Sequence, residues 1–337
     1  MVAQLPGPLI VAPMAGGPST TALVRAAASA GALGFLAAGY KAPDAVAREV
    51  GELRRSGLAY GLNIFLPTAP ADPERVEAYR RVLLPEAERY GVELPDPPLD
   101  DDDHFAAKVG IAVRAAVPWV SFTFGVPDAG VVSELRGAGC RVLVTVTGAG
   151  EARRAAAAGA DLLVVQAGSA GGHSATTDPD GYDGSSTAPE SLREVASAVE
   201  LPLIAAGGTG TAADVRALLA AGAVAVQAGT AFLLADEAGT RPAQREAMLS
   251  GRYAGTAVTR AFTGRPARGL RNRFIEAYSA RAPIGYPAVH HLTAPIRAAA
   301  ARQGDPEALN LWAGTAFAEA RTGPAAAIAA RLSGAGD

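Results

Sequence analysis

One histidine, His173, stands inside a loop of small and polar residues, AGSAGGHSATTDPDG (167–181). An imidazole has an unperturbed pKa near 6.5, so it can accept or donate a proton at neutral pH. A histidine in such a loop has few apolar neighbours, which favours contact with a ligand over burial in a core; the alternative is an exposed loop residue without a role. We predict that His173 is catalytic, acting in proton transfer or in substrate contact.

Two further segments, AAGGTGT (205–211) and QAGTAF (227–232), are rich in glycine and follow short apolar runs. Backbone N–H groups in such turns bind phosphate when a helix follows, because the side chains are small and the helix N-terminus is electropositive. Residues 207–210 can also be a plain tight turn into a helix. Because several neighbouring runs end in such turns, we predict a phosphate site between Gly207–Gly208 and Gly229–Thr230.

Small or polar residues also follow or interrupt other apolar runs. The segment MAGGPST (14–20) has glycines that let a flat ligand approach the backbone, and Ser19 or Thr20 can cap the helix that follows. Asn63 and Gln166 are polar residues in runs that are otherwise apolar. These positions extend the predicted binding site beyond the phosphate turns.

The elements that must position these residues are visible as a regular alternation. Apolar runs alternate with alanine-rich segments of helical length, which is typical of βα units in a parallel sheet covered on both faces. Eight such strands predict closure into an α/β fold, the (β/α)8 TIM barrel, whose active site lies at the carboxyl ends of the strands. The predicted strands are residues 8–14, 34–39, 60–65, 119–125, 141–147, 162–168, 202–208 and 224–233. The predicted helices between them are residues 20–31, 43–56, 127–138, 149–159, 188–199 and 211–222.

Two long segments interrupt this alternation. Residues 66–118 contain a helical stretch near 73–90 and then PDPPLDDDD (95–103), which we expect to be a polar surface loop rather than a metal site. The segment after the eighth strand is rich in Arg and Pro and is long enough to return over the barrel mouth. The predicted parts are a barrel at 1–233, a cap subdomain inserted after the eighth strand at 234–305, and a C-terminal part at 306–337 with a helix over 306–332 that returns to the barrel.

Composition excludes several classes of function. The formal net charge is -3 and no run of Lys or Arg occurs, so we expect no nucleic-acid partner. Cys140 is the single cysteine and precedes an apolar run, which favours a buried structural thiol over a reactive one. We identify no signal peptide and no apolar window of about 18 residues, so we expect a cytoplasmic protein without a membrane partner. The oligomeric state stays open.

With these motifs in place, the chain resembles the nitronate monooxygenases, formerly called 2-nitropropane dioxygenases. The resemblance covers nearly the whole chain, in family order and spacing. Its segments are APMAGG (12–17), LNIF (62–65), VSFTFG (120–125), VQAGSAGGH (165–173), AAGGTG (205–210), QAGTAFL (227–233), YPAVHHLT (286–293) and NLWAG (310–314).

The resemblance implies an FMN-dependent barrel enzyme that oxidises alkyl nitronates with O2 to carbonyl compounds and nitrite. It implies that Asn63 and Gln166 contact the flavin, that Gly171 lies against it, and that Gly208 contacts the phosphate. His173 matches the histidine that serves as catalytic base or positions the substrate. The predicted cofactor-binding residues are Met14, Asn63, Gln166, Gly171, Gly172, Gly207, Gly208, Gln227, Ala228, Gly229 and Thr230.

The chain departs from the family pattern around the histidine. Ala167 and Ser169 stand where Gly and Glu are usual, Ser174 follows the histidine in place of a basic residue, and Thr315 replaces a common Gln. Backbone contacts to FMN tolerate these changes, whereas the choice of small-molecule substrate depends on side chains beside His173. Two alternatives follow: an NAD(P)H-dependent flavin reductase of the enoyl-acyl-carrier type, and a flavin-binding barrel without catalysis.

Overall fold

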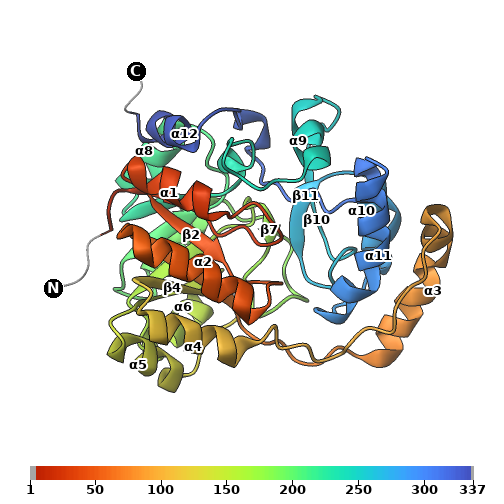
Figure 1. Ribbon diagram of the computed structural model, residues 1–337, viewed down its shortest axis with the longest axis horizontal. Helices are drawn as coiled ribbons and strands as arrows, with labels where there is room; N and C mark the ends of the chain where they lie inside the picture. The colour runs from red at the N-terminus through yellow and green to blue at the C-terminus, as the bar shows by residue number, and fades with distance from the viewer. Residues whose placement is uncertain (1–4, 335–337) are drawn as a thin grey trace.

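The computed structural model describes residues 5–334, and its centre is a closed barrel of eight parallel strands, which confirms the predicted fold class (Figure 1). The strands pair in chain order, and β1 closes the ring against β9, where Ile10 lies beside Gln227. One short strand, β7 (Gly172–His173), lies outside the barrel. The barrel strands are β1 (Leu9–Val11), β2 (Leu33–Ala37), β3 (Tyr60–Phe65), β4 (Trp119–Thr123), β5 (Arg141–Val146), β6 (Leu162–Gln166), β8 (Leu203–Ala206) and β9 (Ala225–Ala228).

Helices follow the strands and cover the outside of the barrel, and several start at a residue whose side chain caps the helix N-terminus. The Thr20 hydroxyl accepts the backbone N–H of Leu23 at 3.0 Å, so the predicted cap of the first helix is confirmed. Thr187 and Thr211 each form a reciprocal capping box with an acidic residue three positions later. The helices around the barrel are α1 (Thr21–Ser29), α2 (Pro43–Ser56), α4 (Phe105–Ala115), α5 (Ala129–Gly137), α6 (Ala149–Ala157), α7 (Ala188–Ala196), α8 (Ala212–Ala220) and α12 (Ala325–Ser333).

Apolar side chains from strands all around the barrel meet in its interior. Phe35, Leu143, Val164 and Ile204 are buried together in one cluster, while alternate residues of the same strands pack under the helices. Cys140 is buried among the helix-facing residues, and burial raises the pKa of its thiol to about 11. The barrel is therefore a packed core, and space for a ligand is confined to its rim.

A second hydrophobic cluster lies over one end of the barrel, at the right of Figure 1, and we call its elements the second layer. Within it α3 packs against α11, so a helix inserted after β3 joins elements that follow β9. β11 pairs with β7, which ties the loop of His173 to the second layer. The second layer comprises α3 (Pro73–Tyr90), α9 (Pro242–Leu249), β10 (Thr256–Thr259), β11 (Ala267–Leu270), α10 (Arg273–Tyr278), η2 (Ser279–Arg281), α11 (Ala288–Arg302) and η3 (Pro306–Ala308).

The largest errors in the predicted extents are in one helix and one strand, and the first predicted strand is also shorter, ending at Val11. The helix expected over 306–332 begins only at Ala325, and the chain before it holds the short 3-10 turns η3 and η4 (Phe317–Glu319). Its alanine-rich composition suggested a helix, but Gly323 has a φ of 122° and Pro324 then caps the helix that does form. The strand expected over 224–233 ends at Ala228, where the chain tightens into the 3-10 helix η1 (Thr230–Phe232).

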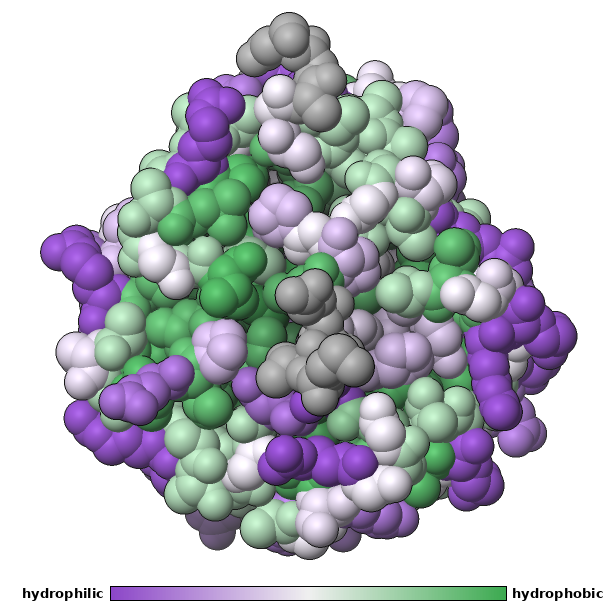
Figure 2. Space-filling view, turned by 90° about the vertical axis from the view of Figure 1, so that its left-hand side faces the viewer, coloured by the Kyte–Doolittle hydropathy of each residue, from purple (hydrophilic) through white to green (hydrophobic). Residues whose placement is uncertain are grey.

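The barrel face remote from the second layer carries apolar side chains bordered by hydrophilic ones (Figure 2). Leu58 and Val224, which precede β3 and β9, are 38% and 46% exposed. These residues lie at the amino ends of strands, whereas the predicted site residues lie at the carboxyl ends. Among the described residues, none of the helices has the length and apolar character needed to span a membrane.

Candidate active site

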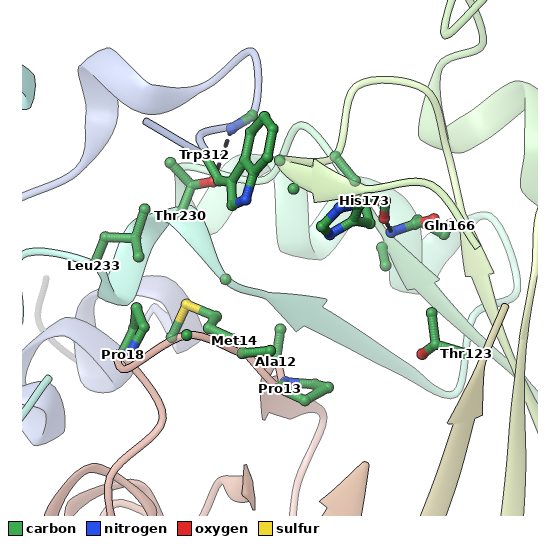
Figure 3. A pocket seen from close by; sticks show the side chains of 18 of the residues that line it. Ala12, Pro13, Met14, Pro18, Thr123, Gln166, His173, Thr230, Leu233 and Trp312 are labelled. Carbon is green, nitrogen blue, oxygen red and sulfur yellow. Dashed lines mark hydrogen bonds between the residues drawn. The ribbon is translucent and has the colours of Figure 1, made fainter. Parts of the chain in front are cut away.

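A cavity of about 480 Å³ lies at the carboxyl ends of the barrel strands, where the second layer meets the rim (Figure 3). In the view of Figure 3, Pro13 and Met14 from the end of β1 line its lower side, and Trp312 and His173 its upper side. Every site residue predicted from the sequence lines this one cavity, which brings together six separate segments of the chain. These residues are Met14, Asn63, Gln166, Gly171, Gly172, His173, Gly207, Gly208, Gln227, Ala228, Gly229 and Thr230.

The turns after β8 and β9 present backbone N–H groups to the cavity. Within residues 5–334, the N–H groups of Gly208, Thr209, Gly229 and Thr230 have no acceptor. The hydroxyl oxygens of Ser169 and Thr209 are buried there, also without a hydrogen-bond partner. Polar groups enclosed in a cavity without partners are costly, and the two hydroxyls are fully buried, so this cluster indicates a place where a ligand supplies the partners.

Gly208 is required by its backbone conformation and by a close neighbour. Its φ is 69°, and a Cβ added there would lie 3.1 Å from the Ser169 hydroxyl oxygen and 3.5 Å from that of Thr315. The Thr315 N–H also donates to the Ser169 carbonyl at 3.0 Å. Two of the residues that depart from the family pattern, Ser169 and Thr315, are thus neighbours of each other and of the predicted phosphate turn.

The side-chain amides of Asn63 and Gln166 have different hydrogen-bond partners. The Asn63 side-chain N–H group donates to the hydroxyls of Ser121 and Thr123 at 2.9 and 3.0 Å, which leaves its carbonyl oxygen without a partner among the described residues. The Gln166 amide donates to the His173 carbonyl at 3.0 Å and accepts the Ala175 N–H at 2.7 Å. Gln166 therefore fixes the backbone on both sides of the histidine.

His173 lies in an aromatic enclosure and its imidazole is neutral. Its ring makes edge contacts with Phe124, Tyr286 and Trp312, and its Nε2 lies 2.9 Å from the Thr263 hydroxyl oxygen. Burial, assisted by two nearby guanidinium groups, lowers the pKa of His173 to about 3. The ring is therefore neutral throughout the physiological range, with a lone pair on one of its two nitrogens.

Arg265 holds the segment after the histidine. Its Nε donates to the Ser174 carbonyl at 3.1 Å, its Nη2 donates to the Thr176 carbonyl, and its guanidinium lies over the Phe124 ring at 4.1 Å from the ring centre. The guanidinium also contributes to the low pKa of His173. Arg265 is 5% exposed, so this clamp is part of the core between barrel and second layer.

With this geometry established, comparison with known proteins decides the family. The family model described as nitronate monooxygenase matches residues 2–333. The chain belongs to the nitronate monooxygenase family. It is 32% identical over 340 residues to a Staphylococcus aureus protein named "Probable nitronate monooxygenase", covering 96% of this chain and 93% of that protein. The family assignment identifies the chain as an oxidoreductase of the kind that acts on nitroalkanes or nitronates.

Solved structures agree with this assignment. The chain is similar to the nitroalkane oxidase from Streptomyces ansochromogenes, with 45% identity, a TM-score of 0.94 and coverage of 98% of this chain and 97% of that one. It also shares its fold with FabK from Thermotoga maritima, at 24% identity and a TM-score of 0.75, covering 97% and 92% of the two chains.

The structure of this nitronate monooxygenase family member adds site residues that sequence reasoning missed. The Tyr40 ring stacks on His290 with ring centres 4.3 Å apart, and both line the cavity. In the sequence, His290 falls in YPAVHHLT (286–293), a segment that carries the family resemblance. The further cavity residues missed from the sequence are Phe65, Thr123, Thr145, Arg241, Gln244, Thr263, Arg297, Asn310, Trp312 and Ala316.

The acidic run, expected to be a surface loop, supports this second group of residues. Asp103 accepts the Tyr40 backbone N–H at 3.0 Å and pairs with the fully buried Lys108 at 2.7 Å. Asp101 lies 2.8 Å from the Nε2 of His291, the neighbour of His290. The run therefore fastens the loop after β2 and the start of α11, which together form one wall of the cavity.

Proposed function

We propose that this protein is an FMN-dependent nitronate monooxygenase that converts alkyl nitronates and nitroalkanes, with O2, to carbonyl compounds and nitrite. The observation that carries the proposal is the convergence on one cavity of a neutral, enclosed histidine and two turns of unpaired N–H groups. The names of the similar proteins, nitronate monooxygenase and nitroalkane oxidase, support the same substrate class.

The residues present fit FMN in two respects. The unpaired N–H groups of Gly208, Thr209, Gly229 and Thr230, with the buried hydroxyls of Ser169 and Thr209, match the oxygens of a phosphate. The free carbonyl oxygen of Asn63 matches an N–H donor on a flavin ring. When bound, the flavin supplies the redox chemistry, and the protein supplies placement and electrostatics. Gln166, whose amide makes one hydrogen bond at its nitrogen and one at its oxygen, is assigned the positioning of His173 in addition to its predicted contact with the flavin.

His173 is the proposed base for neutral nitroalkanes. The Thr263 hydroxyl lies 3.4 Å from the Arg265 carbonyl, to which it can donate, so its oxygen can accept the Nε2–H of His173. This tautomer leaves the lone pair of Nδ1 free, and Nδ1 has no partner among the described residues. Nδ1 then removes the carbon proton of a nitroalkane, while the rings of Phe124, Tyr286 and Trp312 restrict water around it.

We also propose that the second layer serves as a cap over the bound flavin, with α3 included in it because α3 packs on α11. This extends the division made from the sequence, which counted α3 with the barrel. The cavity walls support the idea, since Trp312, Arg241 and Arg297 come from segments after the barrel.

The test of the proposal combines cofactor and activity. The purified protein should show the absorption bands of an oxidised flavin and release FMN, rather than FAD, on denaturation. Adding a nitronate should then produce nitrite with uptake of O2. Rapid anaerobic bleaching of the flavin by NAD(P)H, without nitrite production from nitronates, would favour the enoyl-reductase alternative. A flavin that responds to neither would identify a non-catalytic barrel.

A further inference from the structure

Three arginines, two of them buried and one half-buried, lie between the barrel and the second layer without a carboxylate partner. Arg241, Arg265 and Arg297 form no salt bridge within residues 5–334, and no Asp or Glu lines the cavity. Burying a charge without a counter-ion is expensive, so a group of such residues requires an explanation. The burial of Arg265 is already explained, because its guanidinium hydrogen-bonds the segment after His173 and lies over the Phe124 ring.

Arg297 differs from Arg265 because it faces the cavity with donors to spare. It is 8% exposed and lines the cavity from α11. Its Nε donates to the Thr293 hydroxyl at 3.1 Å and its Nη2 to the His290 carbonyl at 2.7 Å. Its Nη1 donates to no group of the described chain. The guanidinium is thus held rigidly along one edge while a second N–H edge is unused.

The cavity around Arg297 has a net positive charge. Burial lowers the pKa of Arg297 to about 10, which still leaves it charged at neutral pH. Burial also lowers the pKa of His290 well below its usual range, so both cavity histidines are neutral. Arg241 adds a second cation, and its one side-chain hydrogen bond within residues 5–334 goes to the Asn310 side-chain oxygen at 3.1 Å. Nothing among the lining residues compensates these charges.

The hydrogen bonds of Arg297 go to other residues of α11 and not to the predicted phosphate turns. Arg297 is bonded to His290, which stacks on Tyr40 from the loop after β2, and its charge also acts on His173. The phosphate turns follow β8 and β9 instead. The anion that Arg297 fits is therefore one that binds near His173.

We propose that Arg297 is a specificity-determining residue that binds the substrate as the nitronate anion, so that this enzyme favours ionised over neutral nitro compounds. The inference rests on the proposed function and identifies the form of the substrate that the site takes. A nitroalkane and its nitronate differ by one proton, and only the nitronate carries a full negative charge on its two oxygens. A guanidinium donates charge-assisted hydrogen bonds to such a planar group, and Nη1 is the free donor.

The variants Arg297→Met and Arg297→Lys test the proposal, with Arg302→Met, an exposed arginine on the same helix, as the matched control. We expect kcat/KM for preformed ethyl nitronate to fall about 10- to 100-fold in Arg297→Met. The value for nitroethane, added as the neutral compound, should fall less, because the charge on its nitro group develops only as the proton leaves. Arg297→Lys should recover part of the loss, since it restores the charge, and Arg302→Met should match the wild type.

A second measurement does not need turnover. Nitrate is a planar anion that cannot be oxidised at this site, and its binding to the flavin-loaded protein can be followed by calorimetry. We expect Arg297→Met to bind nitrate at least about ten-fold more weakly than the wild type, with unchanged flavin content. Equal losses on nitronate and nitroalkane, or nitrate affinity unaffected by the substitution, would overturn the proposal, as would loss of the flavin. Normal nitrate binding by a wild type that oxidises neither substrate would refute the proposed function and leave the anion subsite intact.

Discussion

The barrel rim and the second layer build opposite sides of the cavity by different means. After β6, β8 and β9 the rim offers mainly backbone, with glycines and small residues that leave N–H groups unpaired. The second layer offers side chains, among them Arg297, His290 and Trp312, held by hydrogen bonds and ring contacts. The rim is suited to a cofactor common to a family, and the second layer to the selection of a substrate.

This difference predicts which substitutions remove the cofactor and which only change catalysis. A backbone site is lost when a side chain is added, because the added atoms displace the turn. A side-chain site is altered when one group is removed, because the surrounding fold persists. Substitutions at the rim should therefore reduce the amount of bound cofactor. Substitutions in the second layer should reduce activity and leave the cofactor content unchanged.

The largest effect is expected at the rim, from Gly208→Leu. The residue has a φ of 69° and its Cβ would press on Ser169, so the substitution should displace both sides of the turn and evict the flavin. The ratio of bound FMN to protein, from absorption after gel filtration, measures this. Gly57→Leu is the control, since Gly57 has a φ of 68° with open space around its Cβ position. Full flavin content in Gly208→Leu would show that the phosphate binds elsewhere.

His173→Asn should leave the cofactor in place and reduce catalysis. We expect activity on a neutral nitroalkane to fall about 100-fold or more, the usual scale for a general base, and activity on a preformed nitronate to fall less. Initial rates of nitrite release on both substrates measure the difference. His104→Asn is a suitable control because His104 is exposed and does not line the cavity. Small and equal losses on both substrates would show that the proton is removed by another group.

The rim was largely predictable from the sequence because its signal is local. A strand that ends in glycines places its turn at the carboxyl end of the barrel whatever the rest of the chain does, and the turn at Gly207–Gly208 follows this rule. Helix positions such as α2 and α3 were equally local, since Pro43 and Pro73 mark their first residues.

The second layer was not predictable because its residues acquire neighbours only through tertiary packing. Tyr40 meets His290 across 250 positions of chain, through the docking of α11 on the barrel. Composition misled at residues 306–324, where the alanines suggested a helix but Trp312 pairs with Gly269 in an isolated bridge. The sequence predicted Gln166 as a polar site residue. Its hydrogen bonds to the backbone of His173 and Ala175 could not be predicted from the residue type.

The pH dependence follows from the enclosure of His173. Burial, with Arg265 and Arg297 nearby, lowers its pKa to about 3, so the neutral base persists as pH falls. Activity on neutral nitroalkanes should show no loss from pH 8 to about pH 5, and its acid limb should lie far below 6.5. The same shift makes stability decline as pH drops from about 6.5 toward 3, because the unfolded chain takes up the proton first.

Arg265→Met sharpens this prediction. Removing the cation favours the protonated imidazole, so the acid limb of the kcat/KM profile should move to higher pH. Burial should still keep the pKa of His173 below the ordinary histidine value. Arg265→Lys, which keeps the charge, should move it less. A wild-type acid limb near 6.5, or no movement in Arg265→Met, would mean that a different group governs the acid side of the profile.

The smallest effect is expected at Thr230, where a substitution tests whether a side chain of the rim strengthens the binding of phosphate by backbone N–H groups. The Thr230 hydroxyl oxygen accepts the Gly314 N–H at 2.9 Å, which joins the turn after β9 to the chain beyond the second layer and leaves the hydroxyl proton free for a phosphate (Figure 3). Thr230→Val keeps the shape and removes that donor, so the Kd for FMN should rise about five-fold, the equivalent of roughly 1 kcal/mol for one hydrogen bond. Thr230→Ser retains the hydroxyl and should bind FMN as the wild type does. If Thr230→Val bound FMN with unchanged affinity, the phosphate would be held by backbone groups alone.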